Sequence, residues 1–347
     1  MFEILSDQSW IAPQIDFLIF LQNLRIEYGH IFNSFFLNIT ALGEFFLPTV
    51  ICAVIYWSID SKGGTYMFAV SGFNVIVAHL FKLLACVYRP WVLSDKVKPL
   101  EAALNHARSY SFPSGHSATS SSVLGALAYF LRNKTWICLT LIVLIMLIGF
   151  SRLWLGVHTP QDVIGGFIIG ITLVFTLYSI INWAEKDKNR YISLLIITNI
   201  LALLIMIYLS YIHKFPWDYV DGKLLVNPMG ALYTTITCYG YTLGILNGLF
   251  ICRRFFPFDA SLGNISTRIL RCLIGLLCFI YILKYPFESV WEGSYRLRFV
   301  LFITFLIGLF PTAIYPYIFT KVENFIKEEK QDLKKNFVLS IMKLRNK

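Results

Sequence analysis

Charged residues are scarce in this 347-residue chain, and their scarcity already excludes an ordinary soluble domain. Only 14% of the residues are charged, whereas 57% are apolar and 16% are aromatic. A soluble fold of this length needs more polar surface to cover itself. The composition therefore predicts an integral membrane protein.

Two other features are missing. Residues 1–33 contain no basic segment followed by an apolar core, so a cleaved signal peptide is not expected. The seven cysteines form no CxxC pair, and no histidine lies at a ligand spacing from them. We interpret them as small apolar side chains rather than metal ligands or disulfide partners. They are Cys52, Cys86, Cys138, Cys238, Cys252, Cys272 and Cys278.

Apolar segments long enough to cross a bilayer recur along the chain. They predict an all-α fold, a polytopic transmembrane helical bundle with about nine spans. The segments cover residues 34–57, 64–88, 113–132, 135–151, 160–183, 191–212, 228–252, 268–286 and 297–320.

The two ends of the chain differ from these segments. Residues 1–33 are expected to form an interfacial helix, because their apolar positions recur at helical spacing and are interrupted by Asp16 and Arg25. Those positions are Ile11, Ile15, Leu18, Leu21 and Leu24. Residues 321–347 form a basic amphipathic tail, for which an interfacial helix is expected and a lipid sensor or partner site is the alternative.

The net charge of +10 indicates a partner class. The cations lie in loops between the spans and in the tail, which favours anionic lipid headgroups over nucleic acid. We divide the chain into an interfacial segment (1–33), a five-span core (34–183), a four-span extension (184–320) and the tail (321–347). The extension has no comparable set of reactive residues, so we expect it to provide packing or a substrate-groove wall.

Two cations end the second expected span. Lys82 and Arg89 are seven residues apart, which is two turns of a helix. On one continuous helix their side chains would leave the same face. The spacing therefore predicts that both converge on one anion.

The next segment begins with the sequence Pro-Ser-Gly-His. Proline is common at a first helical position, so we expect a helix to begin at Pro113. The amides of Ser114, Gly115 and His116 would then be among the unpaired donors of that helix start. Such donors suit phosphate oxygens.

A second helix start is expected at Thr159 and Pro160, as its cap and first residue. His158 would lie just outside this helix and Asp162 at its third position. Asp162 can then accept a hydrogen bond from one ring nitrogen of His158, leaving the other free as a nucleophile.

Together these three motifs resemble those of the type 2 phosphatidic acid phosphatase superfamily, membrane lipid phosphatases related to glucose-6-phosphatase and the vanadium haloperoxidases. The motifs are Lys-six residues-Arg-Pro, Pro-Ser-Gly-His and Ser-Arg-five residues-His-three residues-Asp, and the resemblance covers residues 34–183. It implies that His158 is a nucleophile forming a phosphohistidine, that Asp162 orients it and that His116 is the general acid. It also implies that the phosphoryl oxygens are held by Lys82, Arg89, Ser114, Gly115 and Arg152. No metal and no other cofactor is implied.

The expected function is hydrolysis of a lipid phosphate monoester or diphosphate. Prenyl diphosphate, phosphatidic acid, phosphatidylglycerophosphate and a sphingoid phosphate all fit, and the sequence does not rank them. One alternative is a lipid phosphotransferase that uses the same phosphohistidine. The other is a non-catalytic transporter or scaffold, which we would expect to lack at least one motif residue. A haloperoxidase is disfavoured because those relatives are soluble.

Alternating the spans across the bilayer brings the three motifs to one membrane face. The opposite face carries the basic tail, so the positive-inside rule places the motifs outside a cell membrane. The loop 91–112 lies on the motif face and is expected to be either an ordinary polar loop or a headgroup entrance. Its candidate residues are Trp91, Lys96, Lys98, His106, Arg108 and Tyr110. The sequence does not indicate an oligomeric state.

Overall fold

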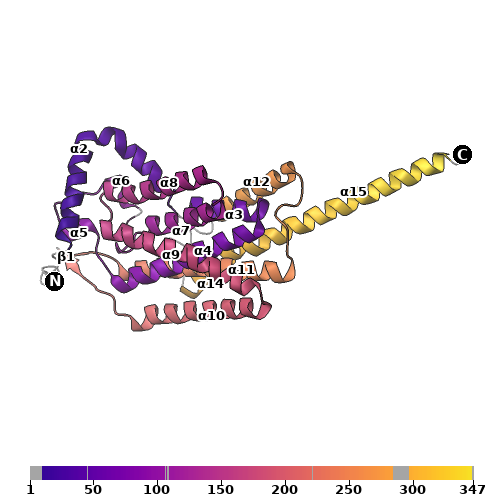
Figure 1. Ribbon diagram of the computed structural model, residues 1–347. Coiled ribbons are helices and arrows are strands. Elements are labelled where there is room, and N and C mark those ends of the chain that lie inside the picture. The colour runs from indigo at the N-terminus through magenta and orange to yellow at the C-terminus, as the bar shows by residue number, and fades with distance from the viewer. Residues whose placement is uncertain are drawn as a thin grey trace.

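The computed structural model describes residues 10–44, 46–105, 107, 109–220, 222–283 and 297–345. Long helices run side by side in one bundle, with a single helix projecting from it (Figure 1). The two strands of the described chain, β1 (Tyr219–Val220) and β2 (Lys223–Leu224), form a short antiparallel hairpin. This architecture confirms the predicted all-α membrane bundle.

The helices of the expected N-terminal segment and core are α2 (Ala12–Ala41), α3 (Phe46–Ser58), α4 (Ser61–Ala85), α5 (Pro90–Leu93), α6 (Glu101–Leu104), α7 (Gly115–Phe130), α8 (Thr135–Trp154) and α9 (Pro160–Glu185). The helices of the extension are α10 (Lys188–Ile207), α11 (Pro228–Phe255), α12 (Ile265–Ile282) and α14 (Leu297–Leu309). Two π-helical turns, η1 (Tyr208–Ile212) and η3 (Phe310–Ile314), extend α10 and α14, and the last helix is α15 (Tyr315–Arg345).

Seven helices of the described chain are long and apolar enough to cross a membrane. An eighth span is added if residues 31–41 and 46–58, which meet at a 45° bend, are counted together. The remaining expected span is α7, which has only 16 residues and is therefore about 24 Å long. It is shorter than a typical helix that crosses the bilayer.

Helix α2 runs through the expected boundary at residue 33 without a break. Its first turns do not present all their apolar residues to the membrane interface. Ile11, Ile15 and Leu18 are instead buried in a cluster with Val97. The N-terminal segment therefore packs against the loop that follows the first motif.

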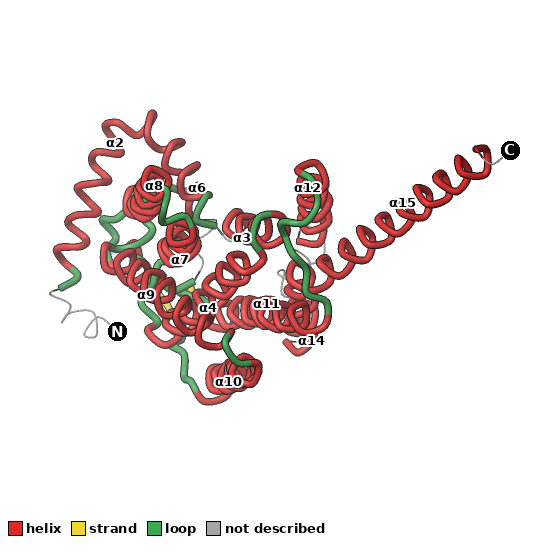
Figure 2. Tube along the Cα trace, turned by 45° about the vertical axis from the view of Figure 1, so that its right-hand side comes forward, coloured by secondary structure: helices red, strands yellow, loops and turns green. Residues whose placement is uncertain are grey.

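Helix α15 runs through the expected boundary at residue 320 and continues the last span. It extends away from the bundle in both views (Figures 1 and 2). The basic tail is thus a continuation of a membrane helix rather than a separate element.

Small residues allow α7 and α9 to pack closely. A Cβ atom on Gly166 would lie 2.7 Å from the Ser114 carbonyl oxygen, and one on Gly170 would lie 2.0 Å from Ser121 Oγ. The Ser114 amide donates a 2.9 Å hydrogen bond to the Asp162 carbonyl oxygen. The starts of the two helices are therefore held together, and they carry the second and third motifs.

The extension packs directly on the core through α11. The Tyr239 hydroxyl on α11 donates a 2.7 Å hydrogen bond to the carbonyl oxygen of Ile76 on α4. Helix α11 also packs closely on α14, where a Cβ atom on Gly308 would lie 2.0 Å from the Tyr241 carbonyl oxygen. Core and extension are consequently one packed unit.

Candidate active site

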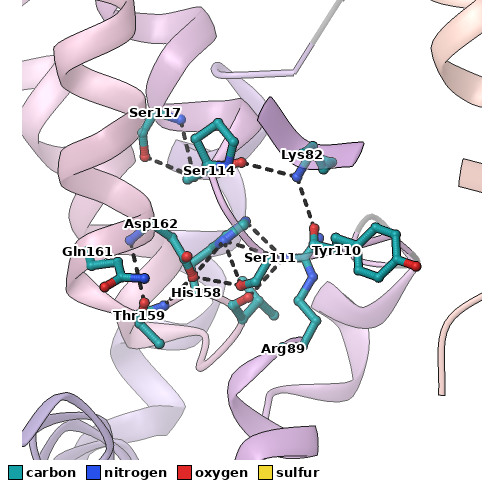
Figure 3. Close-up of polar contacts among 12 residues, drawn as sticks. Lys82, Arg89, Tyr110, Ser111, Ser114, Ser117, His158, Thr159, Gln161 and Asp162 are labelled. Carbon is teal, nitrogen blue, oxygen red and sulfur yellow. Dashed lines mark hydrogen bonds and ion pairs between the residues drawn. The ribbon is translucent and has the colours of Figure 1, made fainter. Parts of the chain in front are cut away.

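The three motifs meet at one end of the bundle, as the alternation of spans predicts. Lys82 lies in the last turn of α4, Ser114 caps α7, and His158 immediately precedes the start of α9 (Figure 3). Arg152 lies in the last turn of α8. Four helix ends therefore supply the site.

The prediction that Lys82 and Arg89 share one helix face is wrong. Helix α4 ends at Ala85, and Cys86 adopts a left-handed conformation with φ of 47°. This residue turns the chain, so Arg89 lies outside the helix as the N-cap of α5. A left-handed non-glycine residue is uncommon, and periodicity alone gives no sign of it.

The two cations nevertheless converge, because backbone carbonyl groups hold them. The Lys82 ammonium donates to the carbonyl oxygens of Tyr110 at 3.0 Å and Pro113 at 3.1 Å. Arg89 donates through Nε to the Ser109 carbonyl oxygen at 2.8 Å and through Nη1 to that of Val157 at 2.9 Å. Both side chains are buried.

Helix α7 begins two residues later than expected. Its N-cap is Ser114 and its first residue is Gly115, so Pro113 precedes the cap. The fold itself uses the Ser114 amide, which bonds to Asp162. Gly115 is the first residue of α7, and the first amides of a helix have no acceptor inside it. A Cβ atom on Gly115 would meet nothing within 4 Å, so an anion can approach the backbone there.

The predicted start of α9 is confirmed. Thr159 is the N-cap, Pro160 is the first residue, and Asp162 completes a capping box. Asp162 Oδ2 accepts a 2.8 Å hydrogen bond from the Thr159 amide. The carboxylate is fully buried and faces the imidazole of His158.

The imidazole of His158 lies between Asp162 and Arg89 (Figure 3). Its Nδ1 is 3.4 Å from Asp162 Oδ2, a long contact in the predicted direction. Its Nε2 is 2.9 Å from Arg89 Nη1. The sequence predicts that this second ring nitrogen is free. In the structure it faces a guanidinium donor instead.

Ser111 belongs to this site and was missed in the sequence. Its hydroxyl donates a 2.6 Å hydrogen bond to Asp162 Oδ2 and lies 3.4 Å from Nδ1 of His158. The available signal was only a serine two residues before Pro113, in a loop without periodicity. Contact with Asp162 depends on how the loop folds back onto α9.

Burial and charge keep His158 neutral. The residue is only 2% exposed, and its burial lowers the pKa of the imidazole well below the ordinary value of 6.5. The positive charges of Arg89, Arg152 and Lys82 lower this pKa further. A neutral imidazole retains the lone pair that a nucleophile needs.

Arg152 connects the site to helix α2. Its Nη1 donates a 2.6 Å hydrogen bond to the Thr40 hydroxyl. The guanidinium is buried, and within the described chain its Nε and Nη2 have no hydrogen-bond partner. Buried charged donors are costly unless they are paired, so they suit an anion.

His116 is the second residue of α7 and is half-buried. Its backbone packs against Gly43 at the break between α2 and α3, where a Cβ atom would lie 3.3 Å from the His116 carbonyl oxygen. Gly43 therefore allows the close approach that fixes the start of α7.

The loop 91–112 contributes backbone acceptors and the Ser111 hydroxyl to the site. Tyr110 is one of the candidate residues for a headgroup entrance. It is buried, and its carbonyl oxygen accepts a hydrogen bond from the Lys82 ammonium. Trp91 lies with its ring centroid 5.9 Å from the Arg89 guanidinium carbon. His106 and Arg108 lie outside the described residues.

Comparisons with known proteins match both parts of the chain. Residues 63–186 match the PAP2 superfamily, and residues 236–327 match the transmembrane extension of PAP2 superfamily phosphatases. The second match coincides with much of the extension.

Individual relatives are similar over part of the chain. Phosphatidylglycerophosphatase B of Bacillus subtilis is 34% identical over 155 residues, covering 41% of this chain and 72% of the relative. The bacitracin transport permease protein BcrC of Bacillus licheniformis is 31% identical over 47% of this chain and 78% of the relative. The undecaprenyl-diphosphatase BcrC of B. subtilis is 29% identical over 30% of this chain and 51% of the relative.

A crystal structure of a transmembrane PAP2 type phosphatidylglycerolphosphate phosphatase from B. subtilis is also similar. It is 27% identical, with a TM-score of 0.43 over 51% of this chain and 90% of that chain. The family match and the match over most of phosphatidylglycerophosphatase B lead to one assignment: the chain belongs to the PAP2 superfamily of membrane phosphatases.

Proposed function

We propose that this chain hydrolyses a lipid phosphate or diphosphate, with His158 as the nucleophile. The observation that carries the proposal is the environment of its imidazole. The ring is buried and neutral, its Nδ1 faces Asp162, and its Nε2 faces Arg89. This is the arrangement that an in-line attack on phosphorus requires.

Three cations support the attack. Lys82, Arg89 and Arg152 converge on the His158 end of α9, and two Arg152 nitrogens have no partner in the described chain. A phosphoryl group at Nε2 would accept hydrogen bonds from these donors and from the amides of Gly115 and His116. Neutralising the equatorial oxygens in this way stabilises the transition state.

The bonds then change in two steps. Nε2 of His158 forms a bond to phosphorus while the bond to the leaving oxygen breaks, and His116 protonates that oxygen. Water next attacks the phosphohistidine, with His116 accepting its proton, and phosphate is released. Asp162 and Ser111 hold Nδ1 throughout, which fixes the orientation of the ring.

The substrate class follows from the setting of the site and from the relatives. Their names specify a phosphatidylglycerophosphatase, undecaprenyl-diphosphatases and a lipid A 1-phosphatase. All of these substrates carry phosphate on a membrane-anchored lipid. A site at the ends of membrane helices lets the lipid tail remain in the bilayer while the headgroup meets the cations.

We further propose that the site faces the extracytoplasmic side of the cell membrane. The other end of the bundle carries the exposed side chains of Lys62 and Arg254 and the basic helix α15, which favours the cytoplasm. Cysteines placed singly at Ser94 and Asn189, in a cysteine-free background, test this orientation. An impermeant thiol reagent should label Ser94→Cys and not Asn189→Cys on intact cells. The opposite result would place the site in the cytoplasm.

Phosphate release from a panel of lipid phosphates tests the activity itself. The purified protein should release phosphate from at least one substrate, with EDTA having no effect and vanadate inhibiting as a pentacoordinate mimic. Activity that is lost in EDTA and restored by Mg²⁺ would contradict this mechanism. Transfer of phosphate to an acceptor other than water would instead establish the phosphotransferase alternative, which product analysis detects.

A further inference from the structure

Three adjoining cavities lie at the other end of the bundle from His158. They are lined mainly by α4, α9, α10 and α11, so they lie where the core meets the extension. His158 precedes the first residue of α9, and Glu185, which lines these cavities, is its last. Because α9 has 26 residues, the two ends are about 39 Å apart. These cavities are therefore separate from the catalytic site.

The smallest of these cavities is a narrow apolar slot of about 50 Å³. Its walls are Ala69 and Phe73 of α4, Leu177 and Ile181 of α9, and further leucines of α10 and α11. On α10 it extends from Tyr191 to Thr198, which corresponds to about 10 Å along the helix. The slot is thus suited to a few methylene groups rather than to a polar ligand.

A pair of amides lies one residue beyond the deep end of the slot. Asn247 Nδ2 of α11 donates a 2.9 Å hydrogen bond to Asn199 Oδ1 of α10. This pair holds the two helices together at that depth. Figures 1 and 2 both show α10 at the edge of the bundle, beside its neighbours. The slot therefore follows the joint between α10 and the remaining helices.

The shallow end of the slot adjoins two wider cavities of about 280 and 220 Å³, each with charged side chains in its lining. Tyr191 lines both the slot and the larger cavity. Thr65 and Leu249 line both the slot and the smaller cavity. Glu185 and Arg253 line both of these wider cavities. The two wider cavities together form a charged mouth, and the shared walls connect this mouth to the apolar slot.

Basic residues outnumber acidic residues in the lining of this mouth. Arg253 pairs with Glu185 and stacks over the Tyr191 ring at 4.9 Å. Asp187 caps α10 through the Asn189 amide and lies 4.0 Å from Arg190. Both acids are therefore already engaged.

Two cations at the mouth remain available. Lys62 lines the smaller cavity and Arg254 the larger one, and both are exposed. Neither forms an ion pair with any residue in the described part of the chain. The mouth thus offers positive charge beside an apolar slot.

We propose that the mouth and the slot together form a binding site for an anionic phospholipid of the leaflet opposite the catalytic site. A few methylene groups of one acyl chain would occupy the slot, and the phosphate headgroup would lie between Lys62 and Arg254. A free phosphate ion would gain nothing from the slot, and a zwitterionic lipid would gain less from the two cations. The bound lipid would join α10 of the extension to α4 and α9 of the core.

Photocrosslinking tests this proposal. The protein is reconstituted in nanodiscs with phosphatidylglycerol or phosphatidylcholine carrying a diazirine on one acyl chain, and the labelled peptides are identified by mass spectrometry. Phosphatidylglycerol should label peptides of α10 and α11 around Leu195 and Leu246 several-fold more than phosphatidylcholine does. Equal labelling by the two lipids, or labelling only at the catalytic end, would overturn the proposal.

Variants make the test specific. Lys62→Gln combined with Arg254→Gln should lower phosphatidylglycerol labelling at this site at least about threefold, to the level of phosphatidylcholine. The matched control is Lys186→Gln, because Lys186 is an exposed cation near this mouth that does not line it. Labelling that falls equally in the control, or in neither protein, would contradict a site built by Lys62 and Arg254.

A second variant tests the slot without changing charge. Ala69→Leu should narrow the slot and lower labelling by both lipids, while thermal unfolding monitored by tryptophan fluorescence reports whether the bundle remains folded. Labelling that is undiminished in folded Ala69→Leu would overturn the placement of the acyl chain. All measurements are repeated in a His158→Ala background, so that the outcome does not depend on phosphatase activity.

Discussion

Arg89 Nη1 lies 2.9 Å from His158 Nε2, so the proposed phosphate-binding cation and the proposed nucleophilic nitrogen are in direct contact. Both side chains are buried, and the Arg89 charge helps to keep the imidazole neutral. In the proposed reaction, phosphate replaces the imidazole as the acceptor of this donor. Substrate binding would thereby expose the lone pair of Nε2 at the moment when it is needed.

Replacing the nucleophile should abolish turnover. His158→Ala should lower kcat by at least about a thousandfold and eliminate the acid-labile phosphoenzyme, because it removes the proposed nucleophile. The measurement is trapping of ³²P from a labelled lipid phosphate by rapid quenching. His213→Ala is the control, because His213 follows the π-helical turn η1 and lies outside the three motifs. This variant should retain the phosphoenzyme. A phosphoenzyme trapped in His158→Ala would refute the assignment.

Replacing the general acid should have an effect that depends on the leaving group. His116→Ala should reduce hydrolysis of a lipid phosphate much more than that of p-nitrophenyl phosphate, whose leaving group needs no protonation. The measurement is the ratio of kcat/KM for the two substrates in each protein. Equal losses on both substrates would show that His116 has a different role.

The protonation of His158 predicts how the protein responds to acid. Because the pKa of the folded imidazole lies below 6.5, the unfolded chain binds a proton first as pH falls. His158 therefore contributes nothing to the pH dependence well above pH 6.5, and it lowers the free energy of unfolding as pH decreases below that value. NMR of ¹³C-labelled histidine, with the signal assigned by its loss in His158→Ala, measures this pKa. A titration midpoint at or above 6.5 would contradict the neutral nucleophile.

Ser111 should act as a positioning residue. Ser111→Ala removes the 2.6 Å hydrogen bond to Asp162 and should lower kcat about tenfold or more, with little change in KM. Ser111→Thr should restore much of the rate because it retains the hydroxyl. Ser120→Ala is the control, since the buried Ser120 hydroxyl bonds only within α7, to the Ser117 carbonyl oxygen at 3.1 Å. A matching loss in Ser120→Ala would indicate a packing effect.

Two glycines should respond in opposite ways. Gly115→Ala should leave thermal stability unchanged but reduce activity, because its Cβ atom meets open space where the phosphate is expected. Gly170→Ala should destabilise the protein by about 1–3 kcal/mol, because its Cβ atom would lie 2.7 Å from the Ser122 amide nitrogen. Thermal unfolding in detergent and phosphate release are measured for both. A stable Gly170→Ala variant would show that α7 and α9 can move apart.

The sequence by itself determined the class of protein and the start of α9. Apolar runs of spanning length specify a helical membrane bundle because a helix satisfies its backbone hydrogen bonds within one segment. The cap at Thr159, the proline at Pro160 and Asp162 at the third position specify a helix start because capping is local chemistry within four residues. The placement of His158 beside Asp162 follows from the same local geometry.

Only the tertiary structure decided which groups converge on that histidine. The left-handed turn at Cys86 and the folding of the loop that carries Ser111 depend on contacts with residues far away in sequence. Arg152 receives its hydrogen-bond acceptor from Thr40, which lies 112 residues earlier in the chain. The cavities between α10 and the core likewise arise from packing between separate helices. Such contacts leave no periodic pattern, because periodicity reports which face of a helix is apolar and not which neighbour covers it.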